Sequence, residues 1–365
     1  MGKALIRAAD VSDLVWLQTG FIGDIILTTA AIHLARQYFP RAKQHIITTA
    51  IGAQVLSGHA DLSSCIVYAK GKAPALAAMR QVRRDLDVVL PSALHRQGVV
   101  LLQAHRSYRS SFLAKFLRLP TITYRQSAGG VLALRRVDRV AVLHEASRIA
   151  LLLEPLGVPR LDMMSAKVSM PIRPLLEPSG WQQQLRQWPG PVVAIAPGSV
   201  WGTKRWPEAA FAELLRRCLR RDDLLVLLLG SAAEAPLATR LAQTAPAGHP
   251  RLLNLAGQTS FDDLKALYPR LSLLVANDSS PIHLASAYAV ATVALFGATV
   301  PAMGFGPLAP GSVVLGTDLD CRPCSDHGPK ECPLGHFKCM RDLAVDRVWA
   351  ACCERLPAKS QAAGC

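Results

Sequence analysis

The stretch "GFIGDIILTTAAI", residues 20–32, places a carboxylate where many α/β proteins bind phosphate. An apolar strand pattern precedes it and a helical pattern follows. Turns of this kind hold phosphate against the N–H groups of a helix's first turn. The charge of Asp24, which follows Gly23, would repel a phosphate. The helix dipole predicts an ionised Asp24, which acts either as a helix cap or as a general base that removes a proton from a hydroxyl.

A second loop combines hydroxyl groups with a cation. In "APGSVWGTKRWPEAAFAELL", residues 196–215, a strand is followed by a loop and then by an amphipathic helix. Lys204 lies in the loop, and Ser199 and Thr203 are hydroxyl donors upstream of it. A cation with nearby hydroxyls at the end of a strand suits a diphosphate. The alternative is an ordinary exposed lysine.

A third stretch, "LLVANDSSPIHLASAYAVATVALFGAT", residues 273–299, runs from a buried strand into a helix. Asp278 ends the strand, Ser279 is a candidate N-cap, and His283 falls in the first turn of the helix. The N–H groups of that turn form an anion site that His283 would reach. A purely structural histidine is the alternative.

Four of the nine cysteines cluster with the spacing C-x2-C-x7-C-x6-C. They are Cys321, Cys324, Cys332 and Cys339. Four thiolates at such positions hold structural zinc in many proteins, but the second pair lacks the tight spacing that marks such sites. A loop shaped by its prolines is the favoured interpretation, and any metal here is expected to be structural rather than catalytic.

Strand-like apolar runs alternate with helical patterns along the chain, which predicts an α/β fold with parallel sheets. The expected strands are "LVWLQT", "HIITT", "DVVLPS" (87–92), "VVAIAPGS", "LLVLLLGS", "LLVAND" and "ATVALFG". A proline-rich stretch without periodicity, residues 170–180, reads as a linker. We therefore expect two α/β domains that face each other across a cleft.

Charge is distributed unevenly over the 365 residues. The net charge is +15, and residues 1–173 hold 23 Lys and Arg against 10 Asp and Glu. This excess predicts an anionic partner: nucleic acid, a membrane surface or a phosphorylated acceptor. "HRSYRSSFLAKFLRLP", residues 105–120, alternates cations with apolar residues, as a membrane-surface segment or an ordinary amphipathic helix does. The chain shows no nucleic-acid signature, signal peptide or apolar run of membrane-spanning length, so a cytoplasmic protein is expected.

The motifs together resemble glycosyltransferase family 9, the lipopolysaccharide heptosyltransferases. The resemblance rests on "GDIILTTAAI", "HEASRIALLLEPLGV", "PGSVWGTKRWPE", "GSAAE", "NDSSPIHLASA" and "VALFGAT", in family order. The cysteine segment is also similar to the tail of many members, particularly those that add the second heptose. The resemblance implies a GT-B fold of two Rossmann-like domains. An acceptor domain would span residues 1–172, a nucleotide-sugar domain 173–345, and a C-terminal helix and tail 346–365.

By position, the resemblance assigns roles to individual residues. Asp24 matches the catalytic base, and Lys204 matches the lysine that binds the donor diphosphate and compensates the charge on the leaving ADP. The donor-contacting loop and helix start correspond to Asp278, Ser279, Ser280 and His283. Glu234 falls near an acidic residue that contacts the nucleoside. Many relatives have glycine where Ser280 stands, so the local fit differs here.

The activity that the resemblance implies is inverting transfer of heptose from ADP-heptose to the lipopolysaccharide inner core, without metal or cofactor. "KRWP" and the cysteine tail favour addition of the second heptose to heptosyl-Kdo2-lipid A, and transfer of a first or later heptose, or of another sugar, stays open. The implied partners are the nucleotide sugar and a lipid A-core acceptor at the inner leaflet of a Gram-negative bacterium. The implied location is cytoplasmic and peripheral to that membrane. Two other classes stay open: a non-catalytic nucleotide-sugar-binding module, which would not need Asp24, and, ranked last, a nucleic-acid-binding protein.

Overall fold

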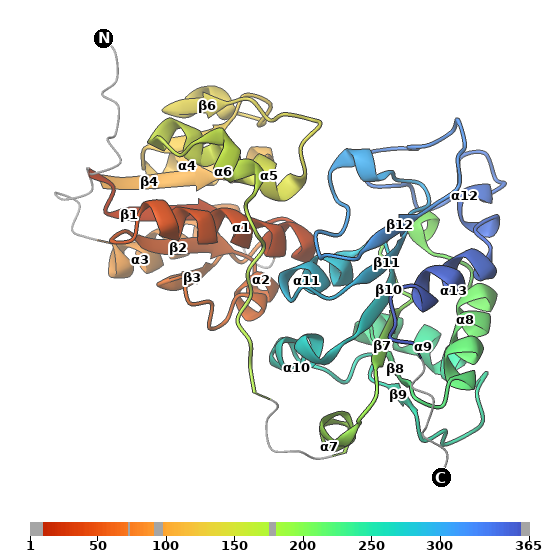
Figure 1. The fold of residues 1–365 in the computed structure, drawn as a ribbon. Helices are drawn as coiled ribbons and strands as arrows, with labels where there is room; N and C mark the ends of the chain where they lie inside the picture. Colours follow the sequence, from red (N-terminus) through yellow and green to blue (C-terminus); the bar gives the residue numbers. More distant parts are fainter. Residues whose placement is uncertain (1–9, 72–73, 91–97, 175–179, 359–365) are drawn as a thin grey trace. The chain divides into compact units, whose positions relative to one another are not determined.

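The computed structural model describes residues 10–71, 74–90, 98–174 and 180–358. The chain divides into two units, Met1–Pro171 and Ile172–Cys365 (Figure 1). The boundary falls within the stretch 170–180 that the sequence marks as a linker, of which residues 175–179 lie outside the described residues.

The first unit is built on a parallel six-stranded sheet with the order β3-β2-β1-β4-β5-β6. Its strands are β1 (Asp13–Leu17), β2 (Lys43–Thr48), β3 (Ser64–Val67), β4 (Val99–Gln103), β5 (Thr121–Tyr124) and β6 (Arg135–Val137). The direction of winding reverses between β1 and β4, where Leu17 lies opposite Gln103. Open α/β sheets bind ligands beyond the carboxyl ends of the strands at such a switch point.

The helices of this unit cover its sheet. They are α1 (Ile22–Tyr38), α2 (Ala50–Val55), α3 (Ala75–Val89), α4 (Tyr108–Leu117), α5 (Glu145–Ala150) and α6 (Arg160–Met164). Successive strand side chains point to opposite faces. Val15 and Leu17 therefore pack with residues of α3 and α4. On the other face, Trp16 donates to Gln44, and the Gln44 amide donates to the Ile32 carbonyl of α1.

The second unit repeats the plan, with a parallel sheet in the order β12-β11-β10-β7-β8-β9. Its strands are β7 (Val192–Ala196), β8 (Leu225–Leu228), β9 (Leu252–Asn254), β10 (Leu273–Asn277), β11 (Thr292–Leu295) and β12 (Val313–Leu315). When the strands of the second sheet are numbered from β7, its order is the same as that of the first sheet. This is the strand order of the doubly wound dinucleotide-binding fold. The switch point of this unit lies between β7 and β10.

The helices of the second unit are α7 (Trp181–Gln187), α8 (Glu208–Arg220), α9 (Ala235–Ala242), α10 (Phe261–Leu267), α11 (Ser280–Ala287), α12 (Lys338–Arg341) and α13 (Val345–Cys353). Of these, α8, α9, α12 and α13 contribute apolar residues to the core on this sheet. The C-terminal helix α13 packs against α8 (Figure 1) and contributes Val348, Ala351 and Cys352 to the core of this unit. The predicted α/β fold with parallel sheets is confirmed.

One predicted strand is wrong. Residues 87–89 of the stretch 87–92 end helix α3, and residues 91–92 lie outside the described residues. The helix buries Ala78, Val82 and Leu86 at a helical spacing, and Val88 is exposed. The strand of this region is β4, "VVLLQ", whose side chains are all buried. A short apolar run at the end of a helix cannot be distinguished from a strand by its periodicity alone.

Candidate functional site

Asp24 lies in the first turn of α1, just beyond the carboxyl end of β1. The N–H of Phe21 donates to Asp24 Oδ2 over 3.3 Å, so the carboxylate partly caps the helix. A Cβ placed on Gly20 would lie 2.8 Å from Asp24 Oδ2 and 3.4 Å from His105 Cδ2. The carboxylate therefore lies against the backbone of Gly20, where a side chain would not fit, and near His105 from the loop after β4. Both strands of the switch point contribute to its surroundings.

The pKa of Asp24 is shifted in the direction opposite to the one that the helix dipole favours. Burial, followed by the negative charge of Glu145, raises the pKa of Asp24 from 3.8 to about 6. The Phe21 N–H, Arg139 and Arg106 act in the opposite direction and lower this pKa. Loss of solvent thus outweighs the dipole and the cations. At pH 7 roughly nine in ten Asp24 side chains are still ionised, with a pKa suited to exchanging a proton near neutrality.

Glu145 belongs to a buried ion cluster that sequence reasoning did not assign. It opens α5 and is 8% exposed. Its Oε2 accepts a hydrogen bond from Arg148 Nη1 over 3.1 Å and another from Arg139. Because α5 packs along α1, this cluster acts electrostatically on Asp24. The signal was present in the sequence as an ionisable pair, Glu145 and Arg148, inside the otherwise apolar segment "HEASRIALLLEPLGV".

His105 ties the loop after β4 to the turn that carries Asp24. Its Nδ1 lies 3.0 Å from Thr19 Oγ1 and 2.8 Å from Ser110 Oγ. Burial, Lys70 and Arg106 lower the pKa of His105 to about 4, so its ring is neutral at pH 7. Lys70 also donates to the Thr19 carbonyl over 3.2 Å. The turn is therefore held by hydrogen bonds from two further segments.

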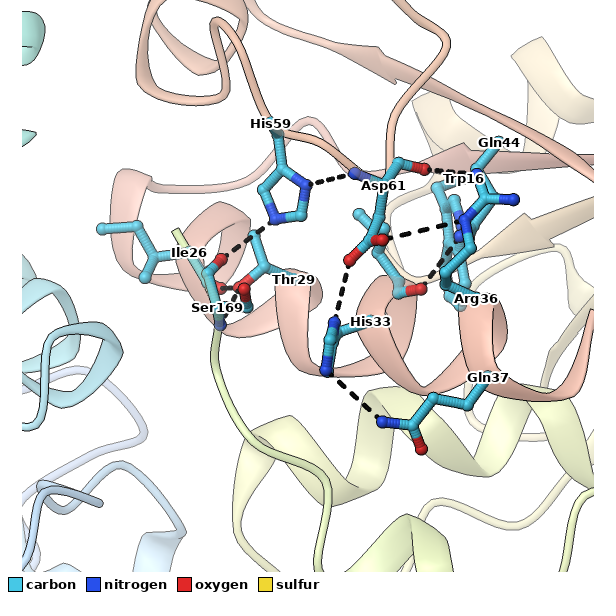
Figure 2. A network of polar contacts seen from close by, with 11 residues as sticks. Trp16, Ile26, Thr29, His33, Arg36, Gln37, Gln44, His59, Asp61 and Ser169 are labelled. Atoms are coloured by element: carbon cyan, nitrogen blue, oxygen red, sulfur yellow. Dashed lines mark hydrogen bonds and ion pairs between the residues drawn. The ribbon is translucent and has the colours of Figure 1, made fainter. Parts of the chain in front are cut away.

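Helix α1 itself is anchored between Ile26 and Gln37 by the polar network of Figure 2. Near its middle, Thr29 Oγ1 accepts the N–H of Ser169 over 3.1 Å, and His59 contacts the Ser169 carbonyl over 3.0 Å. One turn further along, His33 Nδ1 lies 2.9 Å from Asp61 Oδ2. These contacts fix the axis of α1 and with it the position of its first turn.

In the second unit, Lys204 forms an ion pair with Asp278. Lys204 Nζ donates to Asp278 Oδ2 over 2.6 Å, and Thr299 Oγ1 donates to the same oxygen over 2.6 Å. Lys204 is the last residue of a short 3₁₀ helix, Gly202–Lys204, that follows β7. Asp278 follows β10. The pair thus spans the switch point of this sheet. Both side chains are largely buried, so the ammonium group has a fixed position.

Asn277 holds the loop after β7 in place and is a further residue that the sequence analysis did not assign. Its Nδ2 donates to the Pro197 carbonyl over 2.7 Å, and its Oδ1 accepts the N–H of Trp206 over 3.0 Å. Ser199 is buried in the same loop. Glu234 closes over it, because a Cβ on Gly198 would lie 1.8 Å from Glu234 Oε1. The structure therefore brings Ser199, Lys204, Glu234 and Asp278 to one edge of the sheet.

The residues at the start of α11 also lie at this edge. Ser279 occupies the N-cap position, yet its hydroxyl donates to the Asn277 carbonyl over 3.2 Å instead of capping the helix. Ser280 is the first helical residue. His283 is buried, with its ring 6.4 Å from the ring of Phe305. The first turn of α11 thus directs its N–H groups beyond the end of β10.

The cysteine segment packs on the loop that carries Lys204. Thr203 Oγ1 donates to the Pro329 carbonyl, and a Cβ on Gly328 would lie 3.5 Å from Lys204 Cγ. Arg322 donates to four main-chain carbonyls, three of them in the turn after β11. The acceptors are the carbonyls of Phe296, Gly297, Thr299 and Thr317. This segment therefore supports both Lys204 and the turn that contains Thr299.

All four clustered cysteines are free thiols. Cys324 Sγ donates to the Cys321 carbonyl over 3.3 Å, and Cys332 Sγ accepts the N–H of Phe337 over 3.4 Å. Cys339 is buried in the core of the second unit. Across the described ranges, no three His, Cys, Asp or Glu side chains are arranged to hold a metal ion.

No helix in the described part of the chain is long and apolar enough to cross a membrane.

Comparison with known proteins identifies a matching family and several similar proteins. Residues 94–335 match the family described as glycosyltransferase family 9 (heptosyltransferase). Lipooligosaccharide heptosyltransferase 2 of Campylobacter jejuni is 32% identical over 162 residues, 43% of this chain and 48% of that protein. Lipopolysaccharide heptosyltransferase 1 of Pseudomonas aeruginosa is 40% identical over 147 residues, 37% of this chain and 36% of its own. The chain thus spans about half the length or less of these curated relatives.

The fold is shared with a solved heptosyltransferase. The structure of ADP-heptose lps heptosyltransferase II from Escherichia coli superposes with a TM-score of 0.70 at 20% identity, covering 94% of this chain and 97% of the other. At this identity the likeness concerns the fold, and the expected GT-B class is confirmed.

Proposed function

Because the chain belongs to glycosyltransferase family 9, we propose that it transfers heptose from ADP-heptose to the inner core of lipopolysaccharide. The observation that supports this most is the chemistry at the two switch points. One holds a partly buried carboxylate, Asp24, whose pKa is about 6. The other holds a fixed cation, Lys204, beside the first turn of a helix. A base for a hydroxyl acceptor and a site for a diphosphate are the two requirements of sugar transfer from a nucleotide.

The reaction we propose proceeds with inversion at the anomeric carbon. Asp24 accepts the proton of an acceptor hydroxyl while the hydroxyl oxygen forms a bond to that carbon. On the opposite side, the bond to the diphosphate oxygen breaks, and ADP leaves with the electron pair. Asp24 then releases its proton to solvent. A carboxyl group that titrates near pH 6 both accepts and releases this proton readily.

The donor half of the site compensates the charge that develops on ADP. We propose that Lys204 contacts the diphosphate, with the first-turn N–H groups of α11 at Ser279 and Ser280 and the hydroxyl of Ser199 nearby. Thr203 is buried and its hydroxyl donates to the Pro329 carbonyl, so it holds the loop that carries Lys204 instead of contacting the donor. This set of donors supplies positive charge from the protein itself, which favours a metal-independent reaction.

The remaining donor residues are proposed to hold the nucleoside and to orient this set. Glu234 is proposed to contact the nucleoside, because it closes over the loop after β7. Asp278 orients Lys204 through their ion pair. His283, buried in the first turns of α11, completes the donor side.

Release of ADP with two acceptors tests the proposal. Purified protein is given ADP-heptose and either lipid A that carries only its Kdo sugars or the same acceptor extended by the first heptose. We propose addition of the second heptose and expect ADP release only with the extended acceptor. Release with the shorter acceptor would assign the first heptose. Donor binding without release on either acceptor would favour a non-catalytic module, and no donor binding would refute the choice of donor.

The pH dependence of kcat/KM for the acceptor gives a prediction specific to Asp24. A base must be deprotonated to act, so activity is expected to be level above about pH 6 and to fall about tenfold per pH unit below it. Glu145→Gln removes a negative charge that raises the pKa of Asp24, so its acid limb should move to lower pH. Glu154→Gln, which breaks an exposed ion pair with Arg160, is the control and should leave the limb in place. An unshifted limb in Glu145→Gln would contradict the coupling.

The acceptor also implies a place of action. Lipid A is anchored in a bilayer, so we propose that the protein works on the cytoplasmic side of the inner membrane and contacts its surface. The basic first half of the sequence supports this, because the acceptor and the inner leaflet both carry negative charge.

A further inference from the structure

We propose that helix α4 is the surface by which the first unit docks on an anionic lipid bilayer. The inference rests on the proposed function, because it assumes an acceptor anchored in that bilayer. Its first observation is exposed aromatic surface: Tyr108 is 70% exposed and Phe112 is 64% exposed, one turn apart on the same side of α4. Large exposed apolar side chains are informative when they occur together.

The opposite side of α4 packs against the rest of the first unit. It buries Ser110, Ser111, Leu113, Ala114 and Leu117. Tyr108 and Phe112 therefore do not contribute to the core of the unit. A third exposed apolar residue, Val131, lies in a 3₁₀ turn that packs on α4, and the Ser111 hydroxyl bonds the Ala128 carbonyl just before this turn. Val131 is 76% exposed. We call Tyr108 and Phe112 the aromatic face.

The sequence segment that contains α4 carries charge of a single sign. Residues 88–137 contain eight Lys and Arg and no Asp or Glu. On α4 and at its C-cap, Arg109, Lys115 and Arg118 are exposed. A recess beside the helix is lined by Lys115 and Arg118 among other residues, and it offers a place for an anionic headgroup. Protein segments that lie on anionic bilayers combine aromatic side chains, which enter the membrane interface, with surrounding Lys and Arg.

The position of α4 favours a bilayer over other polyanions. Ser110, in its first turn, bonds His105, and both contact Thr19 in the turn before Asp24. The aromatic face therefore begins one helical turn from residues that fix the proposed base. A lipid-anchored acceptor cannot move far from the bilayer surface, so the surface that contacts the bilayer must lie close to the group that activates the acceptor.

Sedimentation with vesicles tests the proposal without any need for activity. The full chain is mixed with vesicles of phosphatidylcholine alone or of equal parts phosphatidylcholine and phosphatidylglycerol. We expect binding to the anionic vesicles only, and a loss of about tenfold or more in the Tyr108→Ser, Phe112→Ser double variant. The matched control is Val88→Ser with Leu161→Ser, which removes two equally exposed apolar side chains from α3 and α6.

The outcomes separate this inference from the proposed function. Equal vesicle binding by the double variant and the wild type would overturn the docking surface, as would tight binding to duplex DNA without binding to vesicles. The double variant should also keep ADP release on a deacylated, water-soluble acceptor while losing it on the acceptor held in vesicles. Wild-type protein that binds vesicles through α4 but transfers no heptose would refute the proposed function and leave the docking surface standing.

Discussion

Asp24→Asn is expected to lower kcat by a factor of about 100 or more and to leave the affinity for ADP-heptose unchanged. The asparagine side chain has the same shape and still accepts a hydrogen bond from the N–H of Phe21. It cannot accept the proton of the acceptor hydroxyl. The loss should therefore fall on turnover, measured as ADP release at saturating substrates, while donor binding is measured by calorimetry.

Unfolding should not explain that loss, because Asp24 is expected to cost stability. Its pKa is raised from 3.8 in the unfolded chain to about 6 in the fold, so ionising it destabilises the folded state above about pH 6 and has no effect well below pH 4. Asn removes this cost. We expect Asp24→Asn to be more stable than the wild type by about 1–3 kcal/mol at pH 8, and the difference to vanish toward pH 4.

A second aspartate serves as the control for this variant. Asp87 is an exposed carboxylate on α3 that pairs with Arg83 one turn away, so Asp87→Asn should change neither turnover nor stability appreciably. Unchanged turnover in Asp24→Asn would remove Asp24 from catalysis and leave it a helix cap. A fall in donor affinity comparable to the fall in turnover would place the carboxylate at the donor instead.

The fold was predictable because its inner strands are buried on both faces, whereas the edge strands β3, β6, β9 and β12 are partly exposed and were not predicted. Strands of that kind read as apolar runs, and six of the seven expected ones lie where the structure has a strand. The stretch 87–92 failed because Val88 and Val89 close a helix with the same local composition as a strand. Strand β4 was missed although "VVLLQ" carries the same signal.

The candidate site was predictable only where its chemistry is local. Asp24, Lys204 and Asp278 each follow a strand in the sequence, and residues after parallel strands gather at one edge of a sheet. Glu145 and Thr299 act on Asp24 and Asp278 from segments 121 and 21 residues away, and no local pattern indicates such contacts. The raised pKa of Asp24 shows the same limit, because the helix dipole is visible in the sequence but the burial that outweighs it is not.

Lys204→Ala is expected to weaken ADP-heptose binding by about 10- to 100-fold, the range of a charge-assisted hydrogen bond. Two effects contribute. The variant loses the ammonium group that we place at the diphosphate, and it leaves Asp278 without its cation, so the carboxylate repels the donor. Calorimetric titration with ADP and with ADP-heptose measures the loss. Lys338→Ala, an exposed lysine of the same unit, is the control and should bind the donor normally.

The double variant Lys204→Ala, Asp278→Asn decides what Asp278 does. If Asp278 only orients Lys204, its charge is harmful once the lysine is gone, and neutralising it should recover part of the lost affinity. If Asp278 contacts the donor itself, the double variant should bind more weakly than Lys204→Ala. We expect partial recovery, because Asp278 Oδ2 already accepts hydrogen bonds from Lys204 and from Thr299. Donor affinity unaffected by Lys204→Ala would refute the position of the diphosphate and with it both roles.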